Sequence, residues 1–180
     1  NEESVNIENA VKDIASISPE KLKFSSYNEG ENKDLEAKVK ITRTPTIAVL
    51  DKDGNYSGLK YSSLPSGHEL NSFILGLYNV AGPGQKVAAE SLEKIEKINK
   101  PVNIKIGISL SCTKCPKTVQ ATQRIATLNK NVEMEMINIF TFQDFKNRYD
   151  IMSVPAIIVD DQHIYFGEKT VEDMLEIINK

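Results

Sequence analysis

The chain has 180 residues, of which 40% are hydrophobic and 26% charged, and its formal net charge is −3. This composition is typical of a globular protein that buries its core without disulfide bonds. The sequence shows no basic stripe that would favour nucleic acid and no apolar run of about 18 residues that would cross a membrane, and residues 1–20 lack the cationic start and apolar block of a signal peptide. Two cysteines are too few for a secreted disulfide scaffold, so we expect a cytoplasmic protein with a working pair of thiols.

The first 82 residues predict two helices with three strands between them. Apolar side chains at helical spacing predict the first helix over residues 3–16. Ser66 and Glu69 are spaced as a capping box, which predicts that the second helix begins there. The buried stripe expected for this second helix is Leu70, Phe73, Ile74 and Leu77. The predicted strands, which are apolar runs bounded by polar turns, span residues 21–26, 46–50 and 56–61.

The sequence Gly82-Pro83-Gly84 interrupts this pattern, and we place a domain boundary there, between residues 1–82 and 83–180. A helix over residues 85–98 follows the break. Apolar periodicity then predicts the order β-α-β-α-β-β-α. These elements span residues 102–108, 116–128, 132–137, 140–148, 156–159, 163–166 and 170–178.

Two similar stretches indicate an internal repeat. TPTIAVLD (44–51) and VPAIIVDD (154–161) both place a proline directly before an apolar strand that leads into an acidic turn. The two prolines, Pro45 and Pro155, lie 155 − 45 = 110 positions apart. The order of the predicted elements repeats at the same offset, so the two halves are expected to share one fold.

The repeat predicts that only the second half carries thiol chemistry. At the offset of 110 positions, Cys112 falls on Glu2 and Cys115 on Val5, so the first half has no cysteines at its equivalent site. The opening strand of the first half would fall before residue 1. A missing strand leaves backbone groups unpaired, and the sequence begins with Asn1 rather than methionine. We therefore expect that the chain was cut from a longer polypeptide or that another segment fills the gap.

The two cysteines stand in Cys112-Thr113-Lys114-Cys115-Pro116, between a predicted strand and a predicted helix. The unpaired N–H groups and the dipole at a helix N-terminus favour a thiolate, which is the reactive form of the thiol. Pro116 suits the first turn because its missing N–H needs no partner there. Lys114 adds positive charge. We expect Cys112 to be the exposed attacking sulfur and Cys115 the more buried resolving one.

Two other interpretations of the cysteines are less favourable. A zinc site needs about four ligands, and the only histidines that could join the two cysteines are His68 and His163. These two histidines do not form the H-x₃₋₅-H pair that is typical of zinc sites. A structural disulfide across four residues would close too short a loop to stabilise the fold much. We therefore expect a redox dithiol without a metal, and we expect both histidines to lie at the surface.

Pro155 precedes a buried strand, so the Val154–Pro155 bond is a candidate cis peptide. The alternative is an ordinary proline at the start of a strand. In folds that place a CxxC motif between a strand and a helix, the loop that contains this proline lies against the dithiol and offers backbone groups to an extended partner segment. Met152 is a candidate for the rim of the site. The predicted substrate-binding residues are Thr113, Lys114, Pro116, Ser153, Val154 and Pro155.

The CxxC motif together with Ser153-Val154-Pro155 resembles the thioredoxin/glutaredoxin superfamily. A longer pattern, LPSGHELNSFILGLYN (64–79) followed by SLEKIEKI and SLSCTKCP, resembles the N-terminal domain of the flavoprotein component of bacterial alkyl hydroperoxide reductase. That resemblance implies an α/β protein of two tandem thioredoxin-like folds that share an extended mixed sheet. The first fold would lack its opening strand in this chain, and the second would carry the only active CxxC.

The resemblance also implies a function, which is to relay electrons to a protein disulfide, with a peroxiredoxin as the expected client. The electrons would come from NAD(P)H through FAD on a thioredoxin-reductase-like flavoprotein module, fused or separate, with no cofactor in this chain. Related modules are fused to thioredoxin reductases. The alternatives are a docking module for a flavoprotein, and a disulfide donor or isomerase.

One position departs from the family pattern. Relatives carry an acidic residue in the strand before the CxxC, and Lys105 stands at the aligned position here. The task of tuning the thiols or moving protons would then be vacant or performed by another residue. Glu133 and Glu135 are candidates by composition only.

Overall fold

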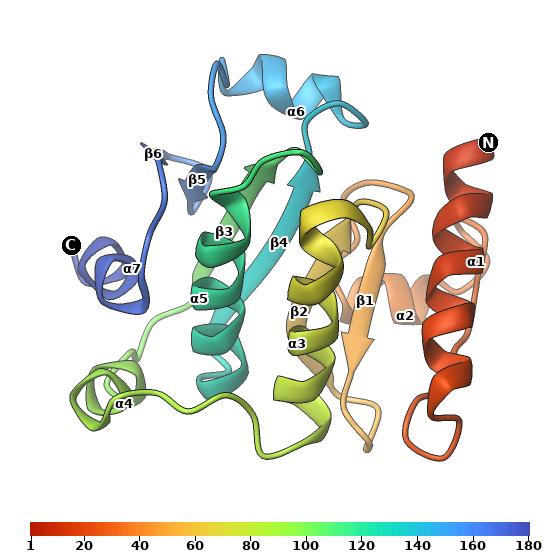
Figure 1. Cartoon of the computed structure of the whole chain (residues 1–180), viewed down its shortest axis with the longest axis horizontal. Coiled ribbons are helices and arrows are strands. Elements are labelled where there is room, and N and C mark those ends of the chain that lie inside the picture. The colour runs from red at the N-terminus through yellow and green to blue at the C-terminus, as the bar shows by residue number, and fades with distance from the viewer.

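The computed structural model describes all residues from 1 to 180 and forms an α/β structure around one mixed sheet (Figure 1). The sheet has six strands in the order β1-β2-β4-β3-β5-β6. The strands are β1 (Ile47–Leu50), β2 (Tyr56–Ser62), β3 (Val102–Ile108), β4 (Val132–Asn138), β5 (Ala156–Val159) and β6 (His163–Phe166). The helices are α1 (Glu2–Ile17), α2 (Lys33–Lys38), α3 (Leu70–Ala81), α4 (Ala89–Glu96), α5 (Cys115–Leu128), α6 (Gln143–Arg148) and α7 (Val171–Ile178), with a 3₁₀ turn η1 (Gly67–Glu69) before α3.

One sheet joins the two halves of the chain. β3 lies near its centre, parallel to β4 and antiparallel to β5, and β6 closes that end. On the other side of β4, β2 pairs in parallel, and β1 pairs antiparallel with β2 at the far edge. The β2–β4 pairing therefore connects two thioredoxin-like folds into the extended mixed sheet expected from the sequence.

The alternation of side chains along the central strands separates two faces of the sheet. Ile104 and Ile106 of β3, with Met134 and Met136 of β4, belong to the larger apolar core. α5 lies over this face and packs against α3, α4 and α7 (Figure 1). The core thus fixes α5, and with it the CxxC motif at its N-terminus, against both halves of the molecule.

The opposite face of the sheet combines a smaller apolar cluster with buried charges. Phe142 and Phe145 pack in the apolar cluster near α6. Lys105 donates hydrogen bonds to Asp161 at 2.7 Å and to Asn103 at 2.8 Å. On the neighbouring β4, Glu135 is 3% exposed and has polar partners of its own. These charged side chains therefore lie on the face of the sheet opposite to α5.

The strand predicted over residues 21–26 does not form. Leu22 and Phe24 are half-buried and alternate with exposed neighbours, but the segment pairs with no strand. In the repeat, this segment corresponds to β4, which pairs with β3. No counterpart of β3 is present beside β1, and a strand without a hydrogen-bonding neighbour is not stable in water.

The capping box predicted at Ser66 is also wrong. Ser66 makes no side-chain capping bond, and Glu69 accepts a hydrogen bond from Ser72 Oγ at 2.6 Å instead. The buried stripe of α3 differs too, because Leu70 is 43% and Ile74 39% exposed.

Close packing explains the orientation of α3. A side chain at Gly76 would place its Cβ 2.1 Å from the hydroxyl oxygen of Tyr61, so only glycine fits there. The face of α3 that meets the sheet and α5 is consequently built from small and polar residues around one aromatic ring. Its buried members are Ser72, Phe73, Gly76 and Asn79.

Other elements match in position but differ in extent. The helix expected over residues 85–98 is the shorter α4, and the helix expected over residues 140–148 begins only at Gln143. The final helix begins as predicted, and the Thr170 side chain caps it by accepting a hydrogen bond from the N–H of Asp173.

Candidate functional site

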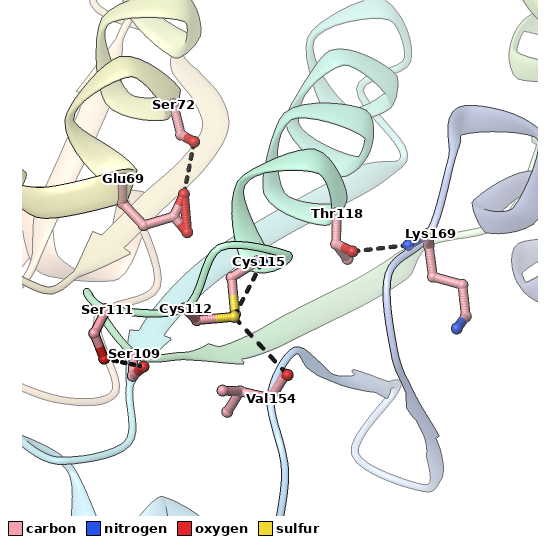
Figure 2. Close-up of a disulfide and its surroundings, with 9 residues drawn as sticks. All are labelled: Glu69, Ser72, Ser109, Ser111, Cys112, Cys115, Thr118, Val154 and Lys169. Carbon is pink, nitrogen blue, oxygen red and sulfur yellow. Dashed lines mark hydrogen bonds between the residues drawn. A yellow bond between two sulfur atoms is a disulfide. The ribbon is translucent and has the colours of Figure 1, made fainter.

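Cys112 and Cys115 form a disulfide where β3 leads into α5 (Figure 2). Cys115 is the first residue of α5 and is completely buried. Cys112 lies in the preceding loop and is half-buried. The Cys112 sulfur is therefore the more accessible of the two, as expected, while the roles of attacking and resolving sulfur stay predictions.

The N-terminus of α5 favours negative charge on Cys112. The main-chain N–H of Cys115 donates a hydrogen bond to the Cys112 sulfur at 3.1 Å. Pro116 occupies the first turn of the helix, and this turn contains no acidic side chain. The free N–H groups and the helix dipole therefore act on the sulfur without a competing carboxylate.

The loop before β5 lies against the disulfide. The Val154–Pro155 bond is cis, as predicted, and so is Thr44–Pro45 at the equivalent position of the first half. The carbonyl oxygen of Val154 lies 3.9 Å from the Cys112 sulfur (Figure 2). The main chain of this loop is consequently placed where an extended segment attached to Cys112 would meet it.

The remaining predicted binding residues lie around Cys112. Thr113 and Lys114 are near the surface within the CxxC loop, and Pro116 is half-buried behind them. Ser153 is exposed on the loop before β5, whereas Pro155 is buried beneath it. All the predicted site residues thus lie in the CxxC loop, in the first turn of α5 and in the loop before β5, and these segments meet at Cys112.

Glu69 lies in the surroundings of the disulfide (Figure 2), although the sequence pattern did not indicate it. Its side chain is completely buried, and one carboxylate oxygen has no hydrogen-bond partner. Burial raises the pKa of Glu69 to about 7, and the hydrogen bond from Ser72 opposes this rise only in part. The carboxyl group can therefore exchange a proton near neutral pH.

The first half of the chain places the turn that carries Glu69 against α5. The turn η1 packs against α5, and the N–H of His68 donates to the carbonyl of Leu110 at 3.2 Å, just before the CxxC motif. Figure 2 shows Glu69 and Ser72 among the residues around the disulfide. In the sequence, Glu69 looked like the last residue of a capping box, and no other signal distinguishes it.

A buried chain of hydrogen bonds holds this carboxyl group. Gln120 of α5 donates to Ser72 Oγ at 3.2 Å, and Ser72 Oγ donates to Glu69. Nearby, Gln123 donates to the Ser72 carbonyl at 2.8 Å and accepts from Tyr61 at 2.6 Å. Because these residues come from both halves, the position of Glu69 depends on how α3 and α5 pack.

The acidic candidates proposed from composition are not at the site. Lys105, Glu133 and Glu135 alternate with the core residues of β3 and β4, so they face away from α5. Lys105 pairs with Asp161, while Glu133 pairs with Lys40 at 2.6 Å. A lysine at the aligned position in β3 therefore does not remove an acid from the surroundings of the disulfide.

The structure contains no group of three or more histidine, cysteine or acidic side chains placed to hold a metal ion. His68 and His163 are both exposed, as expected. None of the helices is long and apolar enough to span a membrane.

Comparisons with known proteins agree with this geometry. Residues 102–179 match the family model described as a thioredoxin domain. The N-terminal domain of the alkyl hydroperoxide reductase AhpF from Enterococcus faecalis superposes with a TM-score of 0.94 at 36% sequence identity, covering 99% of this chain and 85% of that chain. A protein disulfide oxidoreductase from Aeropyrum pernix shares the fold, with a TM-score of 0.76, 20% identity, and coverage of 95% of this chain and 77% of the other.

Full-length curated relatives are much longer than this chain. The alkyl hydroperoxide reductase AhpF of Staphylococcus epidermidis is 32% identical over 81% of this chain and 29% of its own length. A protein named NADH dehydrogenase from Ferdinandcohnia aciditolerans is 32% identical over 91% of this chain and 30% of its own length. The matched region therefore spans less than a third of either protein.

Proposed function

Because the chain belongs to the family of the N-terminal domain of the alkyl hydroperoxide reductase AhpF, we propose that it relays two electrons from a flavoprotein to a protein disulfide. The donor would be a thioredoxin-reductase-like module, and the acceptor would be the disulfide of a peroxiredoxin. The observation that carries the proposal is the Cys112–Cys115 disulfide at the N-terminus of α5, with one sulfur accessible and the other buried.

The relay consists of successive thiol–disulfide exchanges, in each of which one disulfide bond forms as another breaks. A dithiol of the flavoprotein first reduces the Cys112–Cys115 bond and becomes a disulfide itself. The Cys112 thiolate then attacks one sulfur of the client disulfide, which forms a mixed disulfide and releases the first client thiolate. The Cys115 thiolate attacks Cys112, and the second client thiolate leaves. Two electrons have then moved from the dithiol to the client, and the original disulfide is restored.

Glu69 would transfer the proton that the second exchange requires. The buried Cys115 must lose its proton before it attacks, and burial disfavours the free thiolate. A carboxylate with a pKa of about 7 accepts that proton near neutral pH. In this proposal the half of the chain without cysteines supplies the acid–base group, and the half with cysteines supplies the sulfurs.

The loops around Cys112 would position the client. The main chain at Ser153 and Val154 would pair with an extended client segment, with Pro155 holding the loop in place. Thr113, Lys114 and Pro116 would form the opposite border of the contact. We propose that residues 1–82 and residues 83–180 form the two folds, and that the second fold performs the thiol chemistry.

The flavin and nicotinamide chemistry would lie outside this chain. Gly82-Pro83-Gly84 follows a helix rather than a strand, and α4 begins only at Ala89, so the segment does not fit a dinucleotide-binding loop. The implied FAD and NAD(P)H are therefore assigned to the flavoprotein module. A reductive relay also fits a cytoplasmic setting, where thiol systems keep cysteines reduced.

The equilibrium between the dithiol and disulfide forms tests the proposal. The purified protein would be incubated in graded mixtures of reduced and oxidised dithiothreitol, and its free thiols counted. We expect one reversible two-electron transition near that of thioredoxin, roughly −270 mV. A much more oxidising value would replace the relay with a disulfide donor. The absence of a reversible transition would rule out the redox function and leave a docking module.

A further inference from the structure

A small apolar pocket opens beside Cys112, on the side of the loop before β5. Its volume is about 230 Å³, and five of its eight lining residues are hydrophobic. Its walls include Ser109, Ile139, Phe140, Ile151, Met152 and Val154. A pocket of this size is smaller than typical cofactor sites, which begin at about 300 Å³, so a single side chain is a better candidate occupant than a cofactor.

Two residues of the pocket wall contact the reactive cysteine directly. The N–H of Cys112 donates to the carbonyl of Ser109 at 3.2 Å. On the other side, the carbonyl oxygen of Val154 lies 3.9 Å from the Cys112 sulfur, and Figure 2 shows Ser109 and Val154 next to the disulfide. A client segment joined to Cys112 therefore has a neighbouring residue within reach of the pocket.

The mouth of the pocket exposes an unusual amount of apolar surface. Met152 is 84% and Phe140 is 64% exposed, and both border this one cavity. Single exposed apolar residues are normal, but a pair that frames a pocket next to a reactive atom indicates a binding surface. The flexible thioether of Met152 can adapt to side chains of different shape.

We propose that this pocket selects clients that carry a large apolar residue directly beside the cystine sulfur attacked by Cys112. The proposal rests on the relay described above and specifies the sequence that its client presents. The apolar residue would enter between Phe140 and Met152 while the client main chain lies along Ser153 and Val154. The half-buried Lys146 places a cation among the lining residues, so a cationic side chain is disfavoured there.

Synthetic disulfides test this selectivity. Three short glycine- and serine-based peptides would each contain one cysteine, with leucine before it, leucine after it, or serine on both sides. Each would be oxidised to its symmetric disulfide and mixed with the reduced protein. Bis(2-hydroxyethyl) disulfide, which has no apolar side chain, would serve as the reference substrate. We expect one leucine peptide to react about tenfold faster than the serine peptide, in line with the effect of an apolar group in a hydrophobic pocket.

Variants then assign the preference to the pocket. In the double variant Met152→Ser, Phe140→Ser, the leucine-to-serine rate ratio should fall close to one. In the control Ile17→Ser, which removes an 81% exposed apolar side chain of α1 that does not line the pocket, the ratio should stay near its wild-type value. Circular dichroism and the rate with bis(2-hydroxyethyl) disulfide report whether each variant is folded.

The outcomes separate this proposal from the relay itself. If the wild-type protein reduces bis(2-hydroxyethyl) disulfide but shows equal rates with all three peptides, the pocket does not select the client and the inference is wrong. The same conclusion follows if the double variant keeps the wild-type preference. If the wild-type protein reduces no disulfide at all, the relay fails first, and the inference that rests on it is overturned as well.

Discussion

The main-chain N–H of Cys115 donates a hydrogen bond to the sulfur of Cys112 at 3.1 Å, so the second cysteine of the motif stabilises the first through its backbone. The side chain of Cys115 is meanwhile completely buried at the start of α5. The two cysteines consequently differ in accessibility and in environment. The Cys112 sulfur is partly accessible and lies where a thiolate is favoured, whereas the Cys115 sulfur is shielded by the protein around it.

Replacing each cysteine separately should therefore give different results. Cys112→Ser removes the attacking sulfur, and we expect reduction of any protein or peptide disulfide to fall to the level without protein. Cys115→Ser leaves the attack intact but prevents resolution, so the mixed disulfide should accumulate. Mass spectrometry under non-reducing conditions detects the adduct on Cys112. An adduct on Cys115 in the Cys112→Ser variant would reverse the assignment.

The acid–base role of Glu69 predicts a change in the pH dependence of the second exchange. With a Glu69 pKa of about 7, the rate at which the mixed disulfide resolves should rise as the pH increases through 7. Glu69→Gln should lower that rate at least tenfold at about pH 7.5 and remove this pH step. Stopped-flow measurement of the second client thiol checks the prediction. The exposed Glu90→Gln serves as the control and should keep the wild-type profile.

The same carboxyl group predicts how stability changes with pH. Burial raises the pKa of Glu69 from 4.5 to about 7, so the folded state binds its proton more tightly than the unfolded state. The resulting stabilisation is complete below pH 4.5 and is lost as the pH rises to about 7. Relative to Glu69→Gln, the wild-type protein should lose on the order of 3 kcal/mol over that interval and change little above it. Urea unfolding at several pH values measures the difference; parallel curves for the two proteins would contradict a raised pKa.

Ser72 should act on the reaction only through Glu69. Its hydroxyl donates to the carboxylate and lowers the pKa of Glu69, in opposition to burial. Ser72→Ala should therefore raise that pKa further and move the pH step of the resolution rate to higher pH. Attack by Cys112 on a client, measured as release of the first thiol, should not change. Ser25→Ala, at an exposed position remote in sequence, is the matched control.

The features predicted correctly from the sequence were those carried by local patterns. The CxxC motif follows a strand and begins a helix, and the repeat around Pro45 and Pro155 predicted equivalent strands, β1 and β5, in the two halves. Each of these signals depends on residues a few positions apart or on a fixed offset between two copies. The single mixed sheet was expected from the family resemblance. The roles assigned to Cys112 and Cys115 remain predictions for the experiments above.

The features that were missed depend on contacts between distant segments. Glu69 lies near the disulfide because η1, which carries it, packs against α5, and no local spacing reveals this packing. Residues 21–26 have the alternation of a strand but lack a neighbouring strand to pair with. The buried face of α3 follows from the close approach of Gly76 to Tyr61 rather than from its apolar periodicity. In each case the tertiary neighbour decided the outcome.

The buried ion pair between Arg43 and Glu135 should contribute strongly to stability. Arg43 belongs to the first half of the chain, whereas Glu135 lies on β4, and the two side chains are only 16% and 3% exposed. Arg43→Met would leave the carboxylate of Glu135 buried with Ser62 as its remaining hydrogen-bond donor. Because an uncompensated buried charge is costly, we expect a loss of about 3 kcal/mol in the free energy of unfolding, measured with urea.

A matched lysine on the surface provides the control for this loss. Lys97 pairs with Glu93 one helical turn away, and both side chains are largely exposed. Lys97→Met should change the free energy of unfolding by no more than about 0.5 kcal/mol, because water screens the pair. The double variant Arg43→Met, Glu135→Met should recover part of the loss, since it removes both charges. Similar small losses for Arg43→Met and Lys97→Met would mean that water reaches Glu135. The ion pair between Arg43 and Glu135 would then not stabilise the contact between the two halves of the chain.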